Sequence, residues 1–168
     1  MSETRVILRE ACIDDAPLLR HWDEQPHVLE SDPNDDWDWE IELLKTPFWR
    51  EQLVAEVNGV PIGFVQIINP AQEESHYWGD VSNDLRAIDI WIGEAVYLSQ
   101  GYGTIIMRQA NERCFLANNV TGIIIDPLAS NVRAHRFYQR LGFKPVGHRM
   151  FGEDNTLVHQ LDRADYVK

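Results

Sequence analysis

Hydrophobic and polar positions alternate along the chain in short blocks that predict a sheet protein with helices between its strands. Strand-like runs cover residues 4–9, 53–57, 60–68, 86–92, 120–125, 143–150 and 156–161. Asn58-Gly59, between the second and third runs, is typical of a two-residue hairpin turn. Helical spacing or capping covers residues 14–22, 39–44, 104–117 and 130–141, with Ser130 as a cap and Gly142 as a stop, whereas residues 23–40 look irregular and acidic.

This order of elements, β-α-α-β-β-β-α-β-α-β-β, predicts an α/β (α+β) fold, in which a mixed central sheet carries helices on both faces. The length of 168 residues fits one domain, and we expect residues 1–168 to form a single one. No internal repeat and no Gly/Ser linker divides the chain.

Charge narrows the range of ligands. The chain has 15 Lys and Arg against 27 Asp and Glu, a net charge of −12, which argues against a nucleic-acid partner. Such acidity suits a cationic ligand, although an acidic surface also serves solubility alone. The N-terminal residues lead directly into a strand pattern without an apolar leader, and no apolar run is long enough to span a bilayer. We therefore expect a cytoplasmic protein with no membrane partner.

Cysteine and histidine spacing gives no sign of a metal site or a covalent intermediate. Cys12 and Cys114 lie in unrelated segments, and the histidines show no HxH or HxxxH pair. We expect no metal and no cysteine nucleophile.

The most informative local feature is Gly101-Tyr102-Gly103-Thr104, between a strand and a helix. Closely spaced glycines allow the backbone to approach a ligand, and the N–H groups of the following helix suit a phosphate. A GxG pair alone is equally compatible with an ordinary turn. The full GxGxxG dinucleotide pattern is absent, since Met107 is not small.

Together with a second motif, this loop resembles the GCN5-related N-acetyltransferase (GNAT) superfamily. Residues 98–103 (LSQGYG) are similar to the family loop Q/R-x-x-G-x-G/A, with Leu98 as a departure, and residues 131–143 are similar to its N-x-x-A-x-x-x-Y-x-x-x-G-F signature. The resemblance spans almost the whole chain and implies acetyl-coenzyme A as co-substrate. The coenzyme contacts that it implies are Trp91, Ile92, Gly93, Gln100, Gly101, Tyr102, Gly103, Thr104, Asn131 and Tyr138. Because coenzyme A is anionic, it also needs positive groups, which Arg108, Arg133, Arg136 or Arg140 could supply, and we count Arg136 among the expected contacts.

Within that superfamily, three segments resemble aminoglycoside 6′-N-acetyltransferases. They are Asp126-Pro127-x-x-Ser130-Asn131-x-Arg133-Ala134, Arg86-Ala87-Ile88-Asp89 and the aromatic and acidic residues 73–80. A further acidic stretch, residues 30–42, contains Trp37 and Trp39, and carboxylates beside aromatic rings suit a polycation as well as an ordinary surface loop. We expect acceptor contacts from Trp37, Asp38, Glu73, Glu74, Trp78, Asp89 and Asp126.

Acetyl transfer to an amine needs a base, since neutralising an alkylamine at pH 7 costs about 4 kcal/mol. Asp89 is the first candidate for that base and Glu74 the second; either could instead be a solvated carboxylate. The resemblance implies Tyr138 as the general acid for the thiolate, although its helical spacing also fits a core tyrosine. It also implies that a backbone N–H around residues 91–93 polarises the thioester.

The sequence thus predicts an acetyl-coenzyme A-dependent N-acetyltransferase for a cationic small molecule, above all the 6′ amine of an aminoglycoside, by direct transfer in a ternary complex. Alternative acceptors are a polyamine, a siderophore-type lysine derivative and a protein N-terminus. A GNAT-like module that binds coenzyme A without turnover is the alternative from another class. We expect a monomer or a homodimer.

Overall fold

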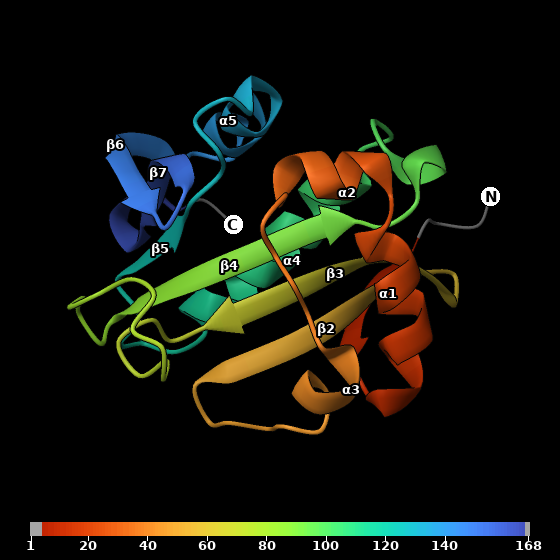
Figure 1. Cartoon of the computed structure of the whole chain (residues 1–168). Coiled ribbons are helices and arrows are strands. Elements are labelled where there is room, and N and C mark those ends of the chain that lie inside the picture. Colours follow the sequence, from red (N-terminus) through yellow and green to blue (C-terminus); the bar gives the residue numbers. More distant parts are fainter. Residues whose placement is uncertain (1–4, 167–168) are drawn as a thin grey trace. The chain divides into compact units, whose positions relative to one another are not determined.

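The computed structural model describes residues 5–166, in which strands and helices follow the predicted alternation (Figure 1). The strands are β1 Val6–Glu10, β2 Arg50–Val57, β3 Val60–Ile68, β4 Leu85–Ile92, β5 Gly122–Ile125, β6 Lys144–Phe151 and β7 Asp154–Asp162. The helices are α1 Ala16–Asp23, α2 Pro26–Ser31, α3 Trp39–Glu42, α4 Tyr102–Phe115 and α5 Val132–Arg140. Short 3₁₀ turns are η1 Ile13–Asp15, η2 Ala95–Tyr97 and η3 Arg163–Asp165.

The strands are hydrogen-bonded in the order β1-β2-β3-β4-β5-β7-β6. The β4–β5 pair is parallel, whereas β1–β2, β5–β7 and β6–β7 are antiparallel, so the predicted mixed sheet is confirmed. The described contacts form two compact units: unit 1 holds residues up to 66 and residues 89–109, and unit 2 holds residues 67–88 and those from 110 onward. The chain passes from one unit to the other within β3, β4 and α4.

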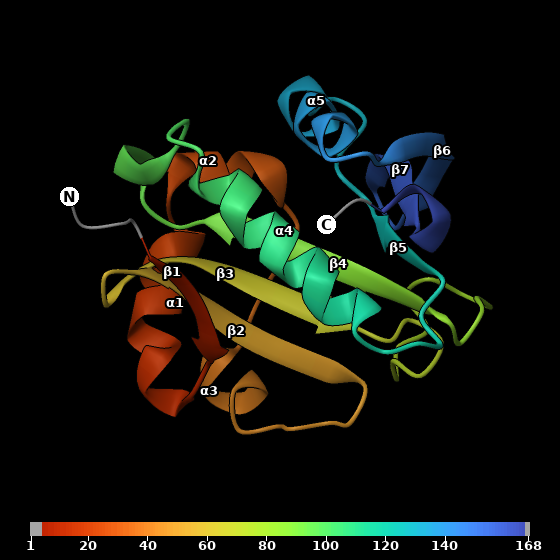
Figure 2. The ribbon, with the colours of Figure 1, turned by 180° about the vertical axis from the view of Figure 1, so that it is seen from behind.

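In unit 1, helices α1–α3 and an aromatic core cover one face of the strands. The β1–β2 register runs from Val6 opposite Val57 to Glu10 opposite Leu53. Asn58 and Gly59 take φ values of 51° and 83°, as a type I′ hairpin turn requires, and this confirms the predicted β2–β3 hairpin. Figure 2 shows the first turns of α4 over the opposite face of β3 and β4. The core on the α1–α3 side includes Leu19, Trp22, Trp39, Phe64 and Trp91.

In unit 2, β5 pairs with a parallel strand on one side and with an antiparallel strand on the other. Arg86 of β4 lies opposite Ile123, and Ile123 lies opposite Leu161 of β7. Buried Ile123 and Leu161 anchor the interior of this unit. Strand β6 is the last strand of the sheet and is exposed along nearly its whole length. Its pairing with β7 is irregular between Pro145 and Gly147, and irregularities of this kind hinder an edge strand from pairing with another molecule.

Two local predictions are wrong. Residues 23–40 are not irregular throughout, because Pro26 opens the short helix α2 at a position where its missing N–H costs nothing. Helix α5 is capped by Asn131 rather than Ser130: the Asn131 side chain accepts from the backbone N–H of Ala134 at 3.1 Å. Among residues 5–166, no helix has the length and apolar character needed to cross a membrane.

Candidate active site

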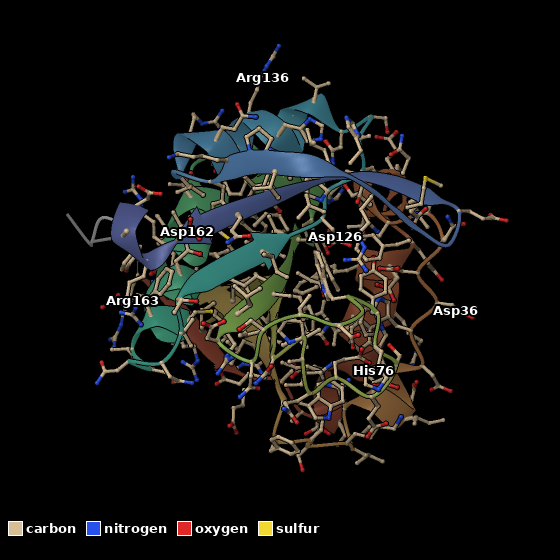
Figure 3. All side chains as sticks on the ribbon, turned by 90° about the vertical axis from the view of Figure 1, so that its left-hand side faces the viewer. Asp36, His76, Asp126, Arg136, Asp162 and Arg163 are labelled. Atoms are coloured by element: carbon tan, nitrogen blue, oxygen red, sulfur yellow. The ribbon has the colours of Figure 1, made fainter. Side chains whose placement is uncertain are left out.

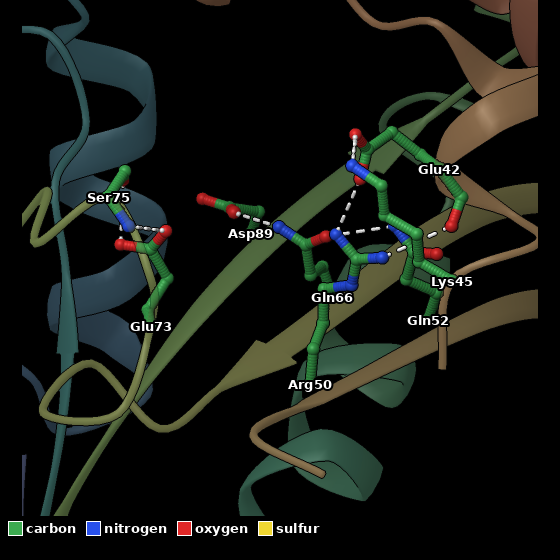
Figure 4. A network of polar contacts seen from close by, with 8 residues as sticks. All are labelled: Glu42, Lys45, Arg50, Gln52, Gln66, Glu73, Ser75 and Asp89. Carbon is green, nitrogen blue, oxygen red and sulfur yellow. Dashed lines mark hydrogen bonds and ion pairs between the residues drawn. The ribbon is translucent and has the colours of Figure 1, made fainter. Parts of the chain in front are cut away.

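In unit 1, strand β4 presents Asp89 on the same face as Trp91, as strand alternation predicts. The carboxylate is enclosed by protein but its residue is still partly exposed, and its Oδ2 accepts a hydrogen bond from Nε2 of Gln66 at 3.0 Å (Figure 4). Burial raises the pKa of Asp89, and the Gln66 bond opposes that rise only in part. A carboxyl group with a raised pKa, on a residue that is still partly exposed, is a stronger base than an ordinary carboxylate and is suited to accepting a proton.

Gln66 is itself held by a second amide. Only 2% of Gln66 is exposed, and its Oε1 accepts from Nε2 of Gln52 at 3.0 Å. The three side chains come from β2, β3 and β4, which are consecutive in the sheet, so they form one line across three strands.

The peptide group between Ile92 and Gly93 is fixed at both of its polar atoms. The Ile92 carbonyl oxygen lies 2.7 Å from His27 Nε2 of α2, and the Gly93 N–H donates to the Ile62 carbonyl at 2.9 Å. A Cβ on Gly93 would lie 2.0 Å from Trp22 Cδ2, so only glycine fits beneath that ring. Since N–H directions alternate along a strand, the N–H of Ile92 points away from β3. Within the predicted range 91–93, Ile92 is therefore the best candidate to polarise a thioester carbonyl.

The predicted glycine loop leads into the start of α4, also in unit 1. Ser99 and Gly101 have φ values of 59° and 85°, which turn the backbone sharply before Tyr102 opens the helix. The Gln100 side chain donates to the Val96 carbonyl and so closes the loop on itself. The first-turn N–H groups of α4, at Tyr102, Gly103 and Thr104, have no acceptor within the helix and suit an anion.

Trp37 and Trp91 line a surface depression in unit 1 together with acidic residues. The Trp37 and Trp39 rings stack at 4.9 Å between centroids, and Trp91 packs on Phe64 at 4.7 Å. Burial raises the pKa of Asp23, one of the lining carboxylates, although Trp39 Nε1 donates to it. Asp38 precedes α3 as an exposed residue. The lining residues are Asp23, Val28, Leu29, Asp32, Asp35, Trp37 and Trp91.

In unit 2, Glu73 stabilises the predicted acceptor loop by hydrogen bonds to residues of the same loop. Its carboxylate accepts from the N–H and hydroxyl of Ser75 at 2.7 and 2.8 Å and from the N–H of Tyr77 at 3.1 Å. Burial alone would raise the pKa of Glu73, but these hydrogen bonds outweigh it, so the pKa lies below its ordinary value. The neighbouring Glu74 is exposed.

Aromatic stacking holds the next part of that loop. The Tyr77 ring lies nearly parallel to Phe151 at 4.3 Å, and its hydroxyl donates to Asp126 Oδ2 at 2.6 Å. Trp78, 6% exposed, packs edge-on against Phe151, so Trp78 is a core residue of unit 2 that the sequence placed at the acceptor. Its contact with an acceptor remains a prediction.

Helix α5 of unit 2 carries the remaining predicted coenzyme residues. Asn131 caps the helix through its Oδ1, and Arg136 extends away from it into solvent (Figure 3). Tyr138 is 7% exposed and packs on Phe137, Phe143 and His159. The packing fits a core tyrosine, and its role as general acid remains a prediction.

Sequence reasoning missed Gln66 and His27, and it named Tyr77 as part of the 73–80 segment without giving it a role. Gln66 had a usable signal, since it is the single polar residue in the apolar run Ile62–Ile68. His27 lies on the helix that was not predicted. Across the described residues, no group of three or more His, Cys, Asp or Glu side chains is placed to hold a metal ion.

Comparison with known sequences identifies a family. A sequence model of the acetyltransferase (GNAT) domain matches residues 12–151. An aminoglycoside N(6′)-acetyltransferase type 1 from Klebsiella pneumoniae is 29% identical over 155 residues, which cover 87% of this chain and 77% of that protein. A kanamycin resistance protein from Rhizobium radiobacter is 36% identical over 76 residues, which cover 45% of this chain and 70% of that protein.

Solved structures agree with this match. The aminoglycoside acetyltransferase AAC(6′)-Ib in complex with coenzyme A superimposes with a TM-score of 0.87 at 26% identity, over 96% of each chain. The complex of the same enzyme with coenzyme A and kanamycin superimposes with a TM-score of 0.86 over the same shares. These likenesses extend the agreement to nearly the full length of the chain.

Proposed function

Since this chain belongs to the GNAT acetyltransferase family, we propose that it transfers the acetyl group of acetyl-coenzyme A to a primary amine of a cationic small molecule, and that this amine is the 6′ amine of an aminoglycoside. Relatives named for that reaction cover most of the chain, and similar structures hold coenzyme A and kanamycin. We propose residues 1–168 as the one catalytic domain, acting in the cytoplasm as a monomer or homodimer.

The observation that carries the proposal is the environment of the Asp89 carboxylate. Its burial raises its pKa while its residue stays partly open, so it can bind an ammonium group and then take a proton from it. The amine nitrogen then attacks the thioester carbon, the carbon–sulfur bond breaks, and the coenzyme leaves as a thiolate. The sulfur takes the proton of the Tyr138 hydroxyl, and the second proton that the nitrogen loses restores that hydroxyl. The N–H of Ile92 is suited to stabilise the carbonyl oxygen during attack.

The other predicted residues complete the arrangement. The turn at Gln100–Thr104 and the start of α4 bind the coenzyme pyrophosphate, with Asn131 and Arg136 as further contacts and Tyr138 as the acid for the thiolate. Acceptor contacts come from Glu73, Glu74, Trp78 and Asp126 of unit 2 and from Trp37 and Asp38 of unit 1. Glu74 is the second candidate base.

The acidic depression of unit 1 supports a polycationic acceptor. It combines three aspartates with two tryptophans, and both residue types attract ammonium groups through charge and cation–π contact. A net charge of −12 adds to that attraction at low ionic strength.

The test is thiol release from acetyl-coenzyme A with kanamycin-type aminoglycosides, polyamines and basic peptides. We expect turnover with aminoglycosides that carry a free 6′ amine and none when a hydroxyl replaces that amine. Asp89→Asn should lower kcat/KM by roughly 10²–10⁴-fold. The matched control is Asp14→Asn, at an exposed aspartate of unit 1, which should leave kcat/KM unchanged. Saturable coenzyme binding without aminoglycoside turnover would reject the proposed acceptor.

A further inference from the structure

The two hydrogen bonds that link Gln52, Gln66 and Asp89 both donate toward Asp89. Gln66 is buried and makes one hydrogen bond on each side: its oxygen accepts from Gln52, and its Nε2 donates to Asp89. An ionised carboxylate can only accept, so this orientation of the Gln66 amide is the one that satisfies both neighbours.

We propose that Gln66, oriented by Gln52, is a positioning residue that reserves Oδ2 of Asp89 for an amide N–H and leaves Oδ1 to the acceptor amine. The proposal rests on the proposed function and adds to it the choice of which carboxylate oxygen takes the proton. While Gln66 donates to Oδ2, the proton from the acceptor ammonium goes to Oδ1.

Gln52 keeps the Gln66 amide from turning over. A side-chain amide can rotate by half a turn with little change in shape, and such a turn would place the Gln66 oxygen against the Asp89 carboxylate. The bond from Gln52 to Gln66 Oε1 opposes this turn, because turning would bring two NH₂ groups together. Lys45 and Arg50, which Figure 4 also shows, both donate to the Glu42 carboxylate.

The experiment compares Gln66→Met, Gln52→Met and the double variant, since methionine keeps the length of glutamine without its amide. Gln66→Met should lower kcat roughly tenfold, the loss expected for one hydrogen bond to a charged group. The KM for acetyl-coenzyme A should not change. Gln52→Met should act in the same direction but less, and the double variant should match Gln66→Met alone. Independent structural effects would instead multiply, and that result would overturn the proposal.

The pH profile supplies a readout that lost packing alone would not move. Gln66 lowers the pKa of Asp89, so its removal should shift the acid limb of kcat/KM toward higher pH, with a larger loss at pH 6 than at pH 8. Gln109→Met, at a glutamine of unit 1 that donates to the Val6 carbonyl, is the matched control and should leave the limb in place. An unshifted limb in Gln66→Met would contradict the proposal.

A substrate-free measurement separates this proposal from the proposed function. The Asp89 carboxyl is followed by carbon NMR titration, with its signal assigned by its loss in Asp89→Asn. It should titrate at higher pH in Gln66→Met than in the native protein, whether or not any amine is acetylated. Absence of turnover in the native protein would reject the proposed function, and an identical titration in both proteins would reject the role of Gln66.

Discussion

The end of β4 in unit 1 and the loop of residues 69–84 in unit 2 both carry predicted acceptor residues, yet they are held in different ways. At β4, the groups are fixed by strand backbone and by partners from other elements: buried Gln66 on Asp89, partly buried His27 on the Ile92 carbonyl and buried Trp22 over Gly93. In the loop, the Glu73 carboxylate accepts a hydrogen bond from the backbone N–H of Ser75, two residues later. The hydroxyl of the exposed Tyr77 donates to Asp126.

The difference teaches where rigidity resides. The β4 end is part of the core of its unit, so a change there should destabilise the whole fold. The loop depends on a few partly exposed hydrogen bonds, and regions of that kind open at low free-energy cost. The proposed base thus lies on the more rigid of the two regions, and the proposed acceptor contacts of the loop lie on the more adaptable one.

The largest effect is expected at Gly93. Gly93→Ala places a methyl group 2.0 Å from the Trp22 ring, which is fully buried and cannot move aside without disturbing α1. Unfolding by urea should show a loss of about 3 kcal/mol or more. Trp22→Leu in the same chain should recover part of that loss, so the two changes together should cost less than their sum. Additive losses would show that the ring contact is not the cause.

A smaller and local effect is expected at Glu73. Glu73→Gln replaces the charged acceptor of the Ser75 and Tyr77 N–H groups, and the ordered turn should lose about 1 kcal/mol after allowance for solvent screening. Hydrogen exchange of those two amides measures the change, while amides of β4 should exchange as before. Equal acceleration in both regions would remove the distinction between them.

The same carboxylate gives the loop a pH dependence of known sign. Because the folded-state pKa of Glu73 is lowered, its contribution is complete above the ordinary carboxyl range and is lost as pH falls through the lowered pKa. The exchange rate of the Ser75 amide in the native protein, divided by its rate in Glu73→Gln at the same pH, should rise on acidification. Exchange that stays constant relative to the variant would contradict it.

The smallest change in stability is expected at Tyr77. Tyr77→Phe keeps the stacking on Phe151 and removes the hydroxyl that donates to Asp126, so the free energy of unfolding should change by about 1 kcal/mol or less. If Asp126 contacts the acceptor, the loss of its donor should raise the KM for the acceptor several-fold with kcat nearly unchanged. An unaltered KM would remove Asp126 from the acceptor site and leave the loop as a structural element.

The elements that the sequence predicted well have strong local causes. Asn58-Gly59 fixes a hairpin through positive φ angles, and Gly101 and Gly142 mark a helix start and a helix end in the same way. The mixed sheet, the position of Asp89 on β4 and the glycine loop before α4 follow from periodicity and from the GNAT motifs. A six-residue helix such as α2, within an acidic segment, has too little periodicity to stand out.

The parts that the sequence could not provide depend on which strand lies beside which. The bond between Gln66 and Asp89 joins residues 23 positions apart, and the bond between His27 and the Ile92 carbonyl joins residues 65 positions apart. A single sequence carries no register between strands, so these partners stay hidden. The Glu73 turn was likewise assigned only to the acceptor, because internal hydrogen bonds of a loop follow from its fold.

The stack of Trp37 on Trp39, with Trp91 tilted against both, also makes unit 1 optically distinctive. Indole rings this close and nearly parallel couple their electronic transitions, so they give a circular dichroism signal that isolated tryptophans lack. Trp37 is the half-buried member and lines the acidic depression beside Trp91. A cation that enters the depression would therefore perturb a coupled pair of chromophores, and a change in this circular dichroism signal would report whether the proposed acceptor binds there.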